Sequence, residues 1–306
     1  MIIVKLQGGL GNQMFQYALG RALSLRLGSD VLFDKSWFSN ILDSETKRTF
    51  ELDVFSLPLR FSNENDLPWE KGNIFLRKFP FLRTALGRPA WNIVFDHSQG
   101  AQNTVLQLRA NQNTFLQGYW QSEKYFEDAK DVIRQDFSFY HQPDYANKTI
   151  LDKITSAQAG GIEAVSVHVR RGDYITNPIT NVHHGILPLE YYQSAMSVIE
   201  KRYARVVYYV FSDDLPWCRD NLRFNSEAIF VDVNVGEPGW KDMRLMSACR
   251  HHILANSSFS WWGAWLNQNK EKVVVAPQEW LSDTKLVHKN LLPEPWVKIS
   301  AQRAKT

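Results

Sequence analysis

The chain of 306 residues contains only two cysteines, Cys218 and Cys249, which are too few for a disulfide framework or a tetrahedral zinc site. A long hydrophobic run is also missing, because the segment 253–269 is interrupted by asparagine, serine and glutamine. No apolar signal segment follows Met1. We therefore expect a cytoplasmic protein without a transmembrane helix.

A large excess of charge of either sign is absent too. Lysine and arginine number 35 against 32 aspartate and glutamate residues, a net charge of +3, which excludes a dedicated nucleic-acid binder. With 44% hydrophobic and 22% charged residues, the composition excludes a disordered chain. The sequence therefore predicts a globular protein of two domains, in which any anion site is local.

The pattern of elements predicts an α/β fold. A strand at 2–6, a glycine loop, a helix from Asn12 that stops near Gly28 and a strand at 31–33 form one βαβ unit. After 161, short apolar strands alternate with helices, which is typical of a parallel sheet. We expect two Rossmann-like domains, residues 1–155 and 156–306, facing each other across a cleft. Between residues 40 and 115 the sequence pattern does not indicate particular helices or strands.

The first glycine loop, Gly8-Gly9-Leu10-Gly11-Asn12-Gln13, has two interpretations. Glycines and a helix N-terminus can cradle a phosphate, but the same loop can be a tight structural turn or bind another ligand. The dinucleotide fingerprint is incomplete, because Met14 stands where a third small residue is needed. Nicotinamide or flavin binding is therefore disfavoured.

The segment His168-Val169-Arg170-Arg171-Gly172-Asp173-Tyr174 follows the end of a predicted buried strand. Arginine presents a fork of donors that suits a diphosphate, whereas the alternative is a solvated loop with an Arg–Asp ion pair. The integrin tripeptide Arg171-Gly172-Asp173 is too short to indicate adhesion.

Metal binding is not predicted from the remaining acidic and histidine residues. Asp213 and Asp214 are adjacent, without the spacing of metal-dependent nucleotide-sugar enzymes, and we expect one of them to cap a helix. The pairs His183-His184 and His251-His252 are poorly placed to share a metal. Spacing alone leaves the choice of a general base open, and the candidates are Glu190, Asp173, His183 and His184.

The turn Asn256-Ser257-Ser258-Phe259-Ser260 joins a strand to a helix and is either a phosphate-binding turn or a helix N-cap. Trp261, Trp262 and Trp265 follow at helical spacing, which favours core packing over a sugar platform.

Together these segments resemble the α-1,2-fucosyltransferases of glycosyltransferase family 11, especially the bacterial members. The resemblance covers most of the chain and rests on 8–17, 118–126, 168–174, 211–214 and 256–262. It implies a GT-B fold in which residues 1–155 form the acceptor-side domain and residues 156–306 the GDP-fucose-binding domain. It also implies an inverting, metal-independent transfer of L-fucose from GDP-fucose to the 2-hydroxyl of a terminal β-galactose. It implies no cofactor other than this co-substrate, and an acceptor that is a free or lipid-linked oligosaccharide, as in O-antigen biosynthesis.

Similarity to the core α-1,6- and protein O-fucosyltransferases implies roles for single residues. Arg170 would hold the β-phosphate and stabilise departing GDP, and His168 would contact the nucleoside. Asp242 looks like the aspartate that pairs with guanine. The residues that would complete donor binding are Ser257, Ser258 and Phe259 in the phosphate and ribose turn, and Asn12, which would face the reacting sugar.

The resemblance does not identify the catalytic base. The core α-1,6-fucosyltransferases have a candidate base shortly after their His-x-Arg element, but this chain has Pro178 near that position. We keep Asp173 and His184 as candidate catalytic residues beside Arg170. Two other functions stay open: a GT-B transferase with a different nucleotide sugar, and a galactoside-binding module, suggested by the eleven tryptophans. The basic aromatic stretch Arg77-Lys78-Phe79 is interpreted as a solvated loop, with peripheral contact to the inner membrane as the alternative.

Overall fold

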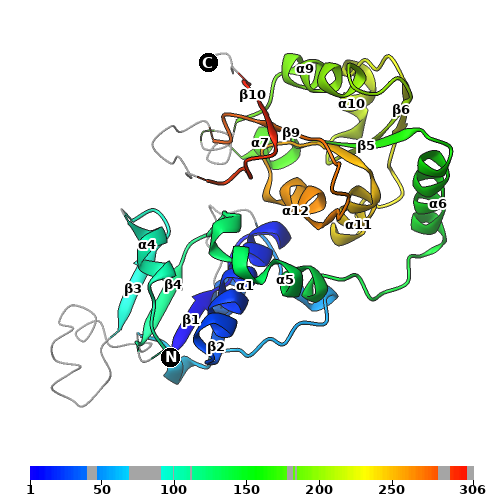
Figure 1. Cartoon of the computed structure of the whole chain (residues 1–306). Helices are drawn as coiled ribbons and strands as arrows, with labels where there is room; N and C mark the ends of the chain where they lie inside the picture. Colours follow the sequence, from blue (N-terminus) through cyan, green and yellow to red (C-terminus); the bar gives the residue numbers. More distant parts are fainter. Residues whose placement is uncertain are drawn as a thin grey trace, which may run out of the picture. The chain divides into compact units, whose positions relative to one another are not determined.

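The computed structural model describes residues 1–39, 47–68, 91–98, 100–110, 112–177, 182, 185–281 and 290–301. The chain divides into two compact units, Met1–Ser138 and Phe139–Thr306, and each is built on a parallel sheet (Figure 1). This confirms the predicted α/β class with two Rossmann-like halves.

The first unit contains a sheet in the order β2-β1-β4-β3. Its strands are β1 (Ile2–Lys5), β2 (Val31–Asp34), β3 (Asn92–Phe95) and β4 (Thr114–Gln117). The predicted helix is α1 (Leu10–Leu27), which ends at Gly28 in the left-handed conformation, as expected for a helix stop. The structure therefore confirms the predicted βαβ unit.

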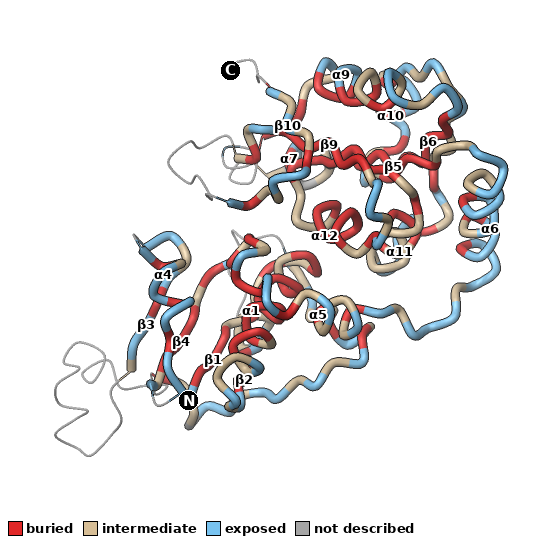
Figure 2. The backbone as a smooth tube through the Cα atoms, in the orientation of Figure 1, coloured by how far each residue is buried: buried red, intermediate tan, exposed pale blue. Residues whose placement is uncertain are grey.

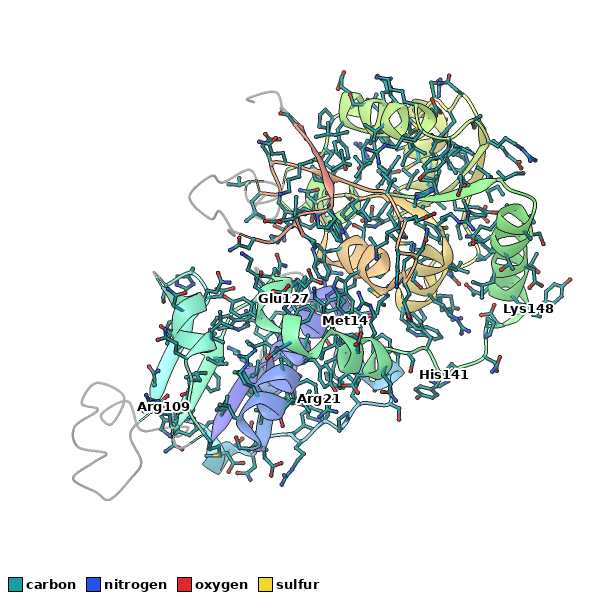
Figure 3. All side chains as sticks on the ribbon, in the orientation of Figure 1. Met14, Arg21, Arg109, Glu127, His141 and Lys148 are labelled. Carbon is teal, nitrogen blue, oxygen red and sulfur yellow. The ribbon has the colours of Figure 1, made fainter. Side chains whose placement is uncertain are left out.

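Shorter elements complete the first unit. Arg21 of α1, labelled in Figure 3, forms an ion pair with Asp136, with 2.9 Å between Nε and Oδ2, and Tyr17 donates to the same oxygen at 2.6 Å. These contacts join α1 to α5. The other elements are η1 (Ser36–Ser39), η2 (Leu52–Val54), η3 (Glu64–Asp66), α4 (Ala101–Leu106), η4 (Glu123–Tyr125), η5 (Glu127–Ala129) and α5 (Lys130–Asp136).

The second unit contains a sheet in the order β10-β9-β8-β5-β6-β7. Its strands are β5 (Glu163–Val169), β6 (Val206–Ser212), β7 (Glu227–Phe230), β8 (His251–Ile253), β9 (Val274–Pro277) and β10 (Val297–Ile299). Its helices are α6 (Tyr145–Ala159), α7 (Gly172–Thr176), α9 (Leu189–Glu200), α10 (Leu215–Asn221), α11 (Trp240–Ala248) and α12 (Ser258–Leu266). Read outward from β5, this is the strand order of dinucleotide-binding domains.

Helices cover both faces of the second sheet, and the alternation of side chains along each strand explains why (Figure 2). Val165, Val167 and Val169 of β5 pack in the core on the α9 and α10 face. Ala164 packs on the opposite face with residues of α6 and α11. His168 shares that second face because it lies an even number of positions from Ala164.

The boundary between the units differs from the predicted one. We expected it between residues 155 and 156, but the contacts divide the chain after Ser138. Ile150 and Ile154 of α6 pack in one core with Ala164 and Leu245 of the second unit. The predicted boundary was therefore wrong because it would cut through α6, whose apolar side is buried on the second sheet.

Trp261, Trp262 and Trp265 of α12 are almost fully buried, and the indole of Trp261 donates to the carbonyl of Leu291 at 2.9 Å. The prediction that they are core residues is confirmed. Within the described ranges, none of the helices has both the length and the hydropathy needed to cross a membrane. The basic stretch 77–79 lies outside the described residues.

Candidate functional site

The order of strands in the second sheet reverses direction at β5 and β8. Strands β6 and β7 extend to one side of β5, whereas β8, β9 and β10 extend to the other. In open parallel sheets, ligands bind beyond the carboxyl ends of the strands at such a reversal. The segment from His168 to Arg170 ends β5, and the turn 256–258 follows β8. Two of the predicted site segments therefore meet at one point of the fold.

Arg170 is held by an acidic residue of the neighbouring strand. Val169 pairs with Ser212 in the register of β5 and β6, which puts Arg170 beside Asp213. Their Nη1 and Oδ2 atoms are 3.0 Å apart, and both side chains are about a quarter exposed. A guanidinium has five N–H donors, enough to hold both Asp213 and an anion. The ion pair therefore orients the arginine at the open end of the sheet.

The close approach of Asp213 requires a glycine. A Cβ atom at Gly172 would lie 2.7 Å from Oδ2 of Asp213, nearer than such atoms normally come. The other oxygen, Oδ1, accepts from the backbone N–H of Arg171 at 2.9 Å. Asp213 thus fixes both the arginine and the loop that follows it. This role of Asp213 was not predicted, because strand register cannot be read from spacing.

Arg171 has a different environment from Arg170. Its Nε lies 3.1 Å from Oδ2 of Asp214, and its guanidinium carbon lies 3.8 Å from the ring centre of Trp217. Asp214 also accepts from the N–H of Trp217 at 3.2 Å and thereby caps α10. The prediction that one of the two aspartates caps a helix is confirmed. Arg171 is therefore fixed to α10.

His168 is buried and neutral. Burial and the charge of Arg170 lower the pKa of its imidazole to about 3. Its ring centroid lies 5.6 Å from that of Phe259, and its Nδ1 has no hydrogen-bond partner within the described part of the chain. A buried polar atom without a partner is costly, which marks this nitrogen as a candidate contact for a ligand.

The serine turn begins α12. Ser257 is the N-cap, and its Oγ accepts from the N–H of Phe259 at 3.3 Å. Tyr174 donates to the carbonyl of Asn256 at 3.0 Å, which joins the loop after β5 to the turn after β8. The N-cap interpretation is confirmed. The first amides of α12 form a partly positive helix terminus at the strand reversal.

Asp242 lies in the first turn of α11, near the same turn. Its Oδ1 accepts from Asn234 at 2.7 Å, and Asn234 exchanges two amide hydrogen bonds with Asn147 of α6. Burial raises the pKa of Asp242 to about 6. A Cβ atom at Gly239 would lie 3.2 Å from Phe259, so α11 begins against the ring that also packs on His168.

The second unit thus brings one set of predicted residues together and leaves the others apart. Glu190 lies exposed in the first turn of α9. The side chains of Asp173, His183 and His184 lie outside the described residues, so their candidate roles stay predictions. The residues gathered at the strand reversal are His168, Arg170, Ser257, Ser258 and Phe259, whereas Asp242 lies on α11, whose start packs on Phe259.

Asn12 lies in the first unit, in the helix that follows the glycine loop. Its Oδ1 accepts from Nε2 of Gln121 at 2.7 Å. Gly8 adopts φ +78°, a left-handed conformation that favours glycine, and a Cβ atom there would lie 2.7 Å from Nδ2 of Asn12. The tight structural turn is therefore confirmed as a feature of this loop.

Charges of both signs lie at the start of α1. The carboxylate of Glu51 accepts from the N–H of Leu10 at 3.1 Å. Burial raises the pKa of Glu51, whereas this hydrogen bond and Arg48 oppose the shift. Nε of Arg48 would lie 3.9 Å from a Cβ atom at Gly9. The phosphate interpretation of the first glycine loop therefore stays a prediction.

Buried histidines outside the site have structural partners. His252 makes hydrogen bonds with Ser166 and Asn267, both at 2.8 Å, and Nδ1 of His251 accepts from Val273 at 3.0 Å. Among the described residues, no group of three or more His, Cys, Asp and Glu side chains could hold a metal ion. Metal independence stays a prediction, tested below by chelation.

Comparison with known proteins identifies the family. The family model "Glycosyl transferase family 11" matches residues 89–300. An α-1,2-colitosyltransferase of Escherichia coli is 32% identical over 306 residues, covering 98% of this chain and 99% of the relative. The bovine galactoside α-(1,2)-fucosyltransferase 1 is 30% identical over 155 residues, covering 49% of this chain and 43% of the relative.

Among solved structures, the fucosyltransferase NodZ from Bradyrhizobium aligns with a TM-score of 0.45 and 15% identity, over 86% of this chain and 92% of that chain. The family assignment rests on the sequence matches, which extend over most of the chain and include the segments that form the strand reversal of the second sheet. The chain belongs to glycosyltransferase family 11.

Proposed function

We propose that the protein is an inverting α-1,2-fucosyltransferase, which transfers L-fucose from GDP-fucose to the 2-hydroxyl of a terminal β-galactose. The observation that carries the proposal is the oriented Arg170 at the strand reversal, beside the N-terminus of α12, in a chain of family 11. The α-1,2 linkage is supported by the names of the Escherichia coli and bovine relatives.

The chemistry requires stabilisation of a leaving diphosphate. The bond between the anomeric carbon and the phosphate oxygen breaks, the acceptor oxygen bonds to that carbon from the opposite face, and the hydroxyl proton leaves to a base. Positive charge develops on the sugar and negative charge on GDP, as in glycoside hydrolysis. Arg170 and the first amides of α12 would stabilise the negative charge without a metal.

The remaining residues would recognise the nucleoside. Asp242 offers a carboxylate to the N–H donors of guanine, and His168 and Phe259 form a buried edge beside it. Ser257 and Ser258 would bind the phosphate or the ribose. Asp173 and His184 stay candidate catalytic residues, and Asn12 stays a candidate contact of the reacting sugar.

A second donor is favoured by one observation, the 32% identity to an α-1,2-colitosyltransferase. Colitose is L-fucose without its 3-hydroxyl, so a single hydroxyl separates the two donors. A site that binds this hydroxyl rejects the deoxy sugar strongly, whereas an apolar site discriminates weakly. Family membership favours either transferase over a galactoside-binding module.

A donor competition experiment tests the proposal. Transfer from GDP-fucose, GDP-colitose and UDP-galactose to lactose is measured with GDP or UDP as inhibitor. We expect transfer from GDP-fucose, with inhibition by GDP and not by UDP. Preference for GDP-colitose would support the second donor, and preference for UDP-galactose would overturn the guanine assignment of Asp242.

The acceptor is proposed to be a free or lipid-linked oligosaccharide that ends in galactose. A lipid-linked acceptor would require peripheral contact with the cytoplasmic side of the inner membrane. Sedimentation with vesicles of anionic lipid tests that contact, and recovery of all the protein in the supernatant would argue for a free acceptor.

A further inference from the structure

In the sheet of the first unit, β1 and β4 are the two central strands and pair with each other. The glycine loop follows β1, and the turn 118–121 follows β4. Open parallel sheets bind ligands beyond the carboxyl ends of their strands, which is where these two segments lie. The residues of this turn have no role in donor binding above.

The turn 118–121 has an unusual backbone. Trp120 adopts φ +54°, which is rare for a residue other than glycine, and Gly118 adopts φ +152°. A Cβ atom at Gly118 would lie 2.2 Å from Cγ of Asp96, so that carboxylate packs directly on the turn. Oδ2 of Asp96 accepts from the N–H of Tyr119 at 2.7 Å and from that of Trp120 at 3.4 Å.

This conformation persists because the surroundings fix it. The indole of Trp120 is 1% exposed, and its Nε1 has no hydrogen-bond partner in the described part of the chain. Strained backbone of this kind concentrates at binding sites, where it sets the position of a side chain. The side chain set here is that of Tyr119.

Tyr119 presents its ring beside the glycine loop. The side chain is 38% exposed, and its Cε1 would lie 3.2 Å from a Cβ atom at Gly8. A partly exposed aromatic ring on a rigid turn loses little entropy on binding and offers an apolar face. The C–H face of a pyranose packs on such a surface.

A pair of side-chain amides also lies beside Gly8. Gln121 donates to Asn12 at 2.7 Å, which holds both amides at the carboxyl ends of β1 and β4. The two amides together have more donors and acceptors than this one bond uses. Their geometry suits a sugar hydroxyl, which donates one hydrogen bond and accepts others.

The charges nearby are of both signs. The carboxylates of Glu51 and Asp96 accept from backbone N–H groups at this end of the sheet, and the side chain of Arg48 lies beside Gly9 and near Glu51. A neutral sugar suits such surroundings, because it needs no net charge of either sign. We propose that Tyr119, Asn12 and Gln121 bind the terminal galactose of the acceptor, an inference that rests on the proposed transferase function.

Kinetics of transfer from GDP-fucose to lactose test this proposal with Tyr119→Ala and Tyr119→Phe. We expect Tyr119→Ala to raise the KM for lactose about tenfold, since a stacked ring contributes on this scale. The KM for GDP-fucose and kcat stay within about twofold, and Tyr119→Phe keeps the wild-type KM because the ring is retained. Tyr145→Ala is the control, since Tyr145 is 89% exposed on α6.

An unchanged KM for lactose in Tyr119→Ala would overturn the proposal, as would an equal rise in the KM for GDP-fucose. Failure of the proposed transferase function would give a different result, because the wild-type protein would then form no product. Lactose binding is then measured directly by saturation-transfer NMR. Binding by the wild type that is lost in Tyr119→Ala upholds the galactose site, and absent or equal binding overturns it.

Discussion

Two adjacent arginines have separate tasks. Arg170 is held by Asp213 at the strand reversal, whereas Arg171 is fixed by Asp214 and by the ring of Trp217. In the sequence only the resemblance singles out Arg170, and the packing of α10 against the loop after β5 gives the physical difference between the two. The difference leads to opposite expectations for their replacement.

Arg170→Ala is expected to lower kcat about a hundredfold, because an anion-stabilising donor is removed. Its melting temperature is expected to fall less than that of Arg171→Ala, because the guanidinium carbon of Arg170 lies 5.9 Å from the ring centre of Tyr174, whereas that of Arg171 lies 3.8 Å from the ring centre of Trp217. Arg171→Ala is expected to lower the melting temperature, because its ion pair and ring contact are both lost. Transfer kinetics and thermal denaturation of both variants check this. If both variants lost the same factor in kcat and had the same melting temperature, the separate roles of Arg170 and Arg171 would be contradicted.

GDP affinity is expected to rise with pH through about 6, the pKa of Asp242. The carboxylate accepts the guanine N–H donors only when ionised, so protonation weakens binding. Calorimetry from about pH 5 to pH 8 measures this, with Asp242→Asn as the control because the phosphate of GDP also titrates near 6. The same pH dependence in Asp242→Asn would remove the guanine role.

The folding stability is expected to change with pH in the opposite direction to the GDP affinity, through the same Asp242 carboxyl group. Because the folded-state pKa of Asp242 is raised, its favourable contribution is present below the usual aspartate pKa and is lost as pH rises through about 6. Asp242→Asn is therefore expected to raise the melting temperature near pH 8 and not near pH 4. A uniform effect at both pH values would contradict the buried, titrating carboxylate.

At the scale of elements, α1 is joined to the loops before and after it by a buried glutamine. Nε2 of Gln13 donates to the carbonyls of Gly8 and Thr49 at 2.8 and 2.9 Å, and its Oε1 accepts from Glu51 at 2.9 Å. The sequence predicted this helix and its stop at Gly28 correctly. The buried amide could not be predicted, because its partners come from 36 or more positions away as well as from the adjacent loop.

Gln13→Ala is expected to destabilise the first unit by about 2–4 kcal/mol, because three backbone groups lose their partner in a buried place. Gln107→Ala is the matched control, since Gln107 is exposed beside α4, and its effect is expected to stay within about 0.5 kcal/mol. Chemical denaturation measures both. A loss of stability equal to that of the control would contradict the role of the amide.

The same contrast, between signals from neighbouring residues and contacts with residues far along the chain, explains which other elements could be predicted. Strand and helix alternation after 161 was predictable, because short apolar strands and an N-cap such as Ser257 are local signals. The place of α6 was not, because it depends on the contact of Ile150 and Ile154 with residues far along the chain. The pairing of Arg170 with Asp213 likewise depends on strand register.

At the scale of the whole molecule, each unit has one parallel sheet with polar residues at the carboxyl ends of its central strands. The proposed donor residues lie at the ends of β5 and β8 and on α11, and the proposed galactose residues lie beyond β1 and β4. The sequence predicted the α/β class and the two units, and the resemblance supplied the candidate donor residues. It did not predict the turn 118–121, whose geometry depends on Asp96 and a buried indole.

The most direct test is transfer from GDP-fucose to lactose in the presence of a chelator, with the new linkage determined by NMR and with Arg170→Ala measured in parallel. We predict an α-1,2 linkage on the terminal galactose, formed at the same rate with and without chelator and largely abolished in Arg170→Ala. A different linkage, a rate that collapses on chelation, or the absence of both transfer and GDP-fucose hydrolysis would contradict the account.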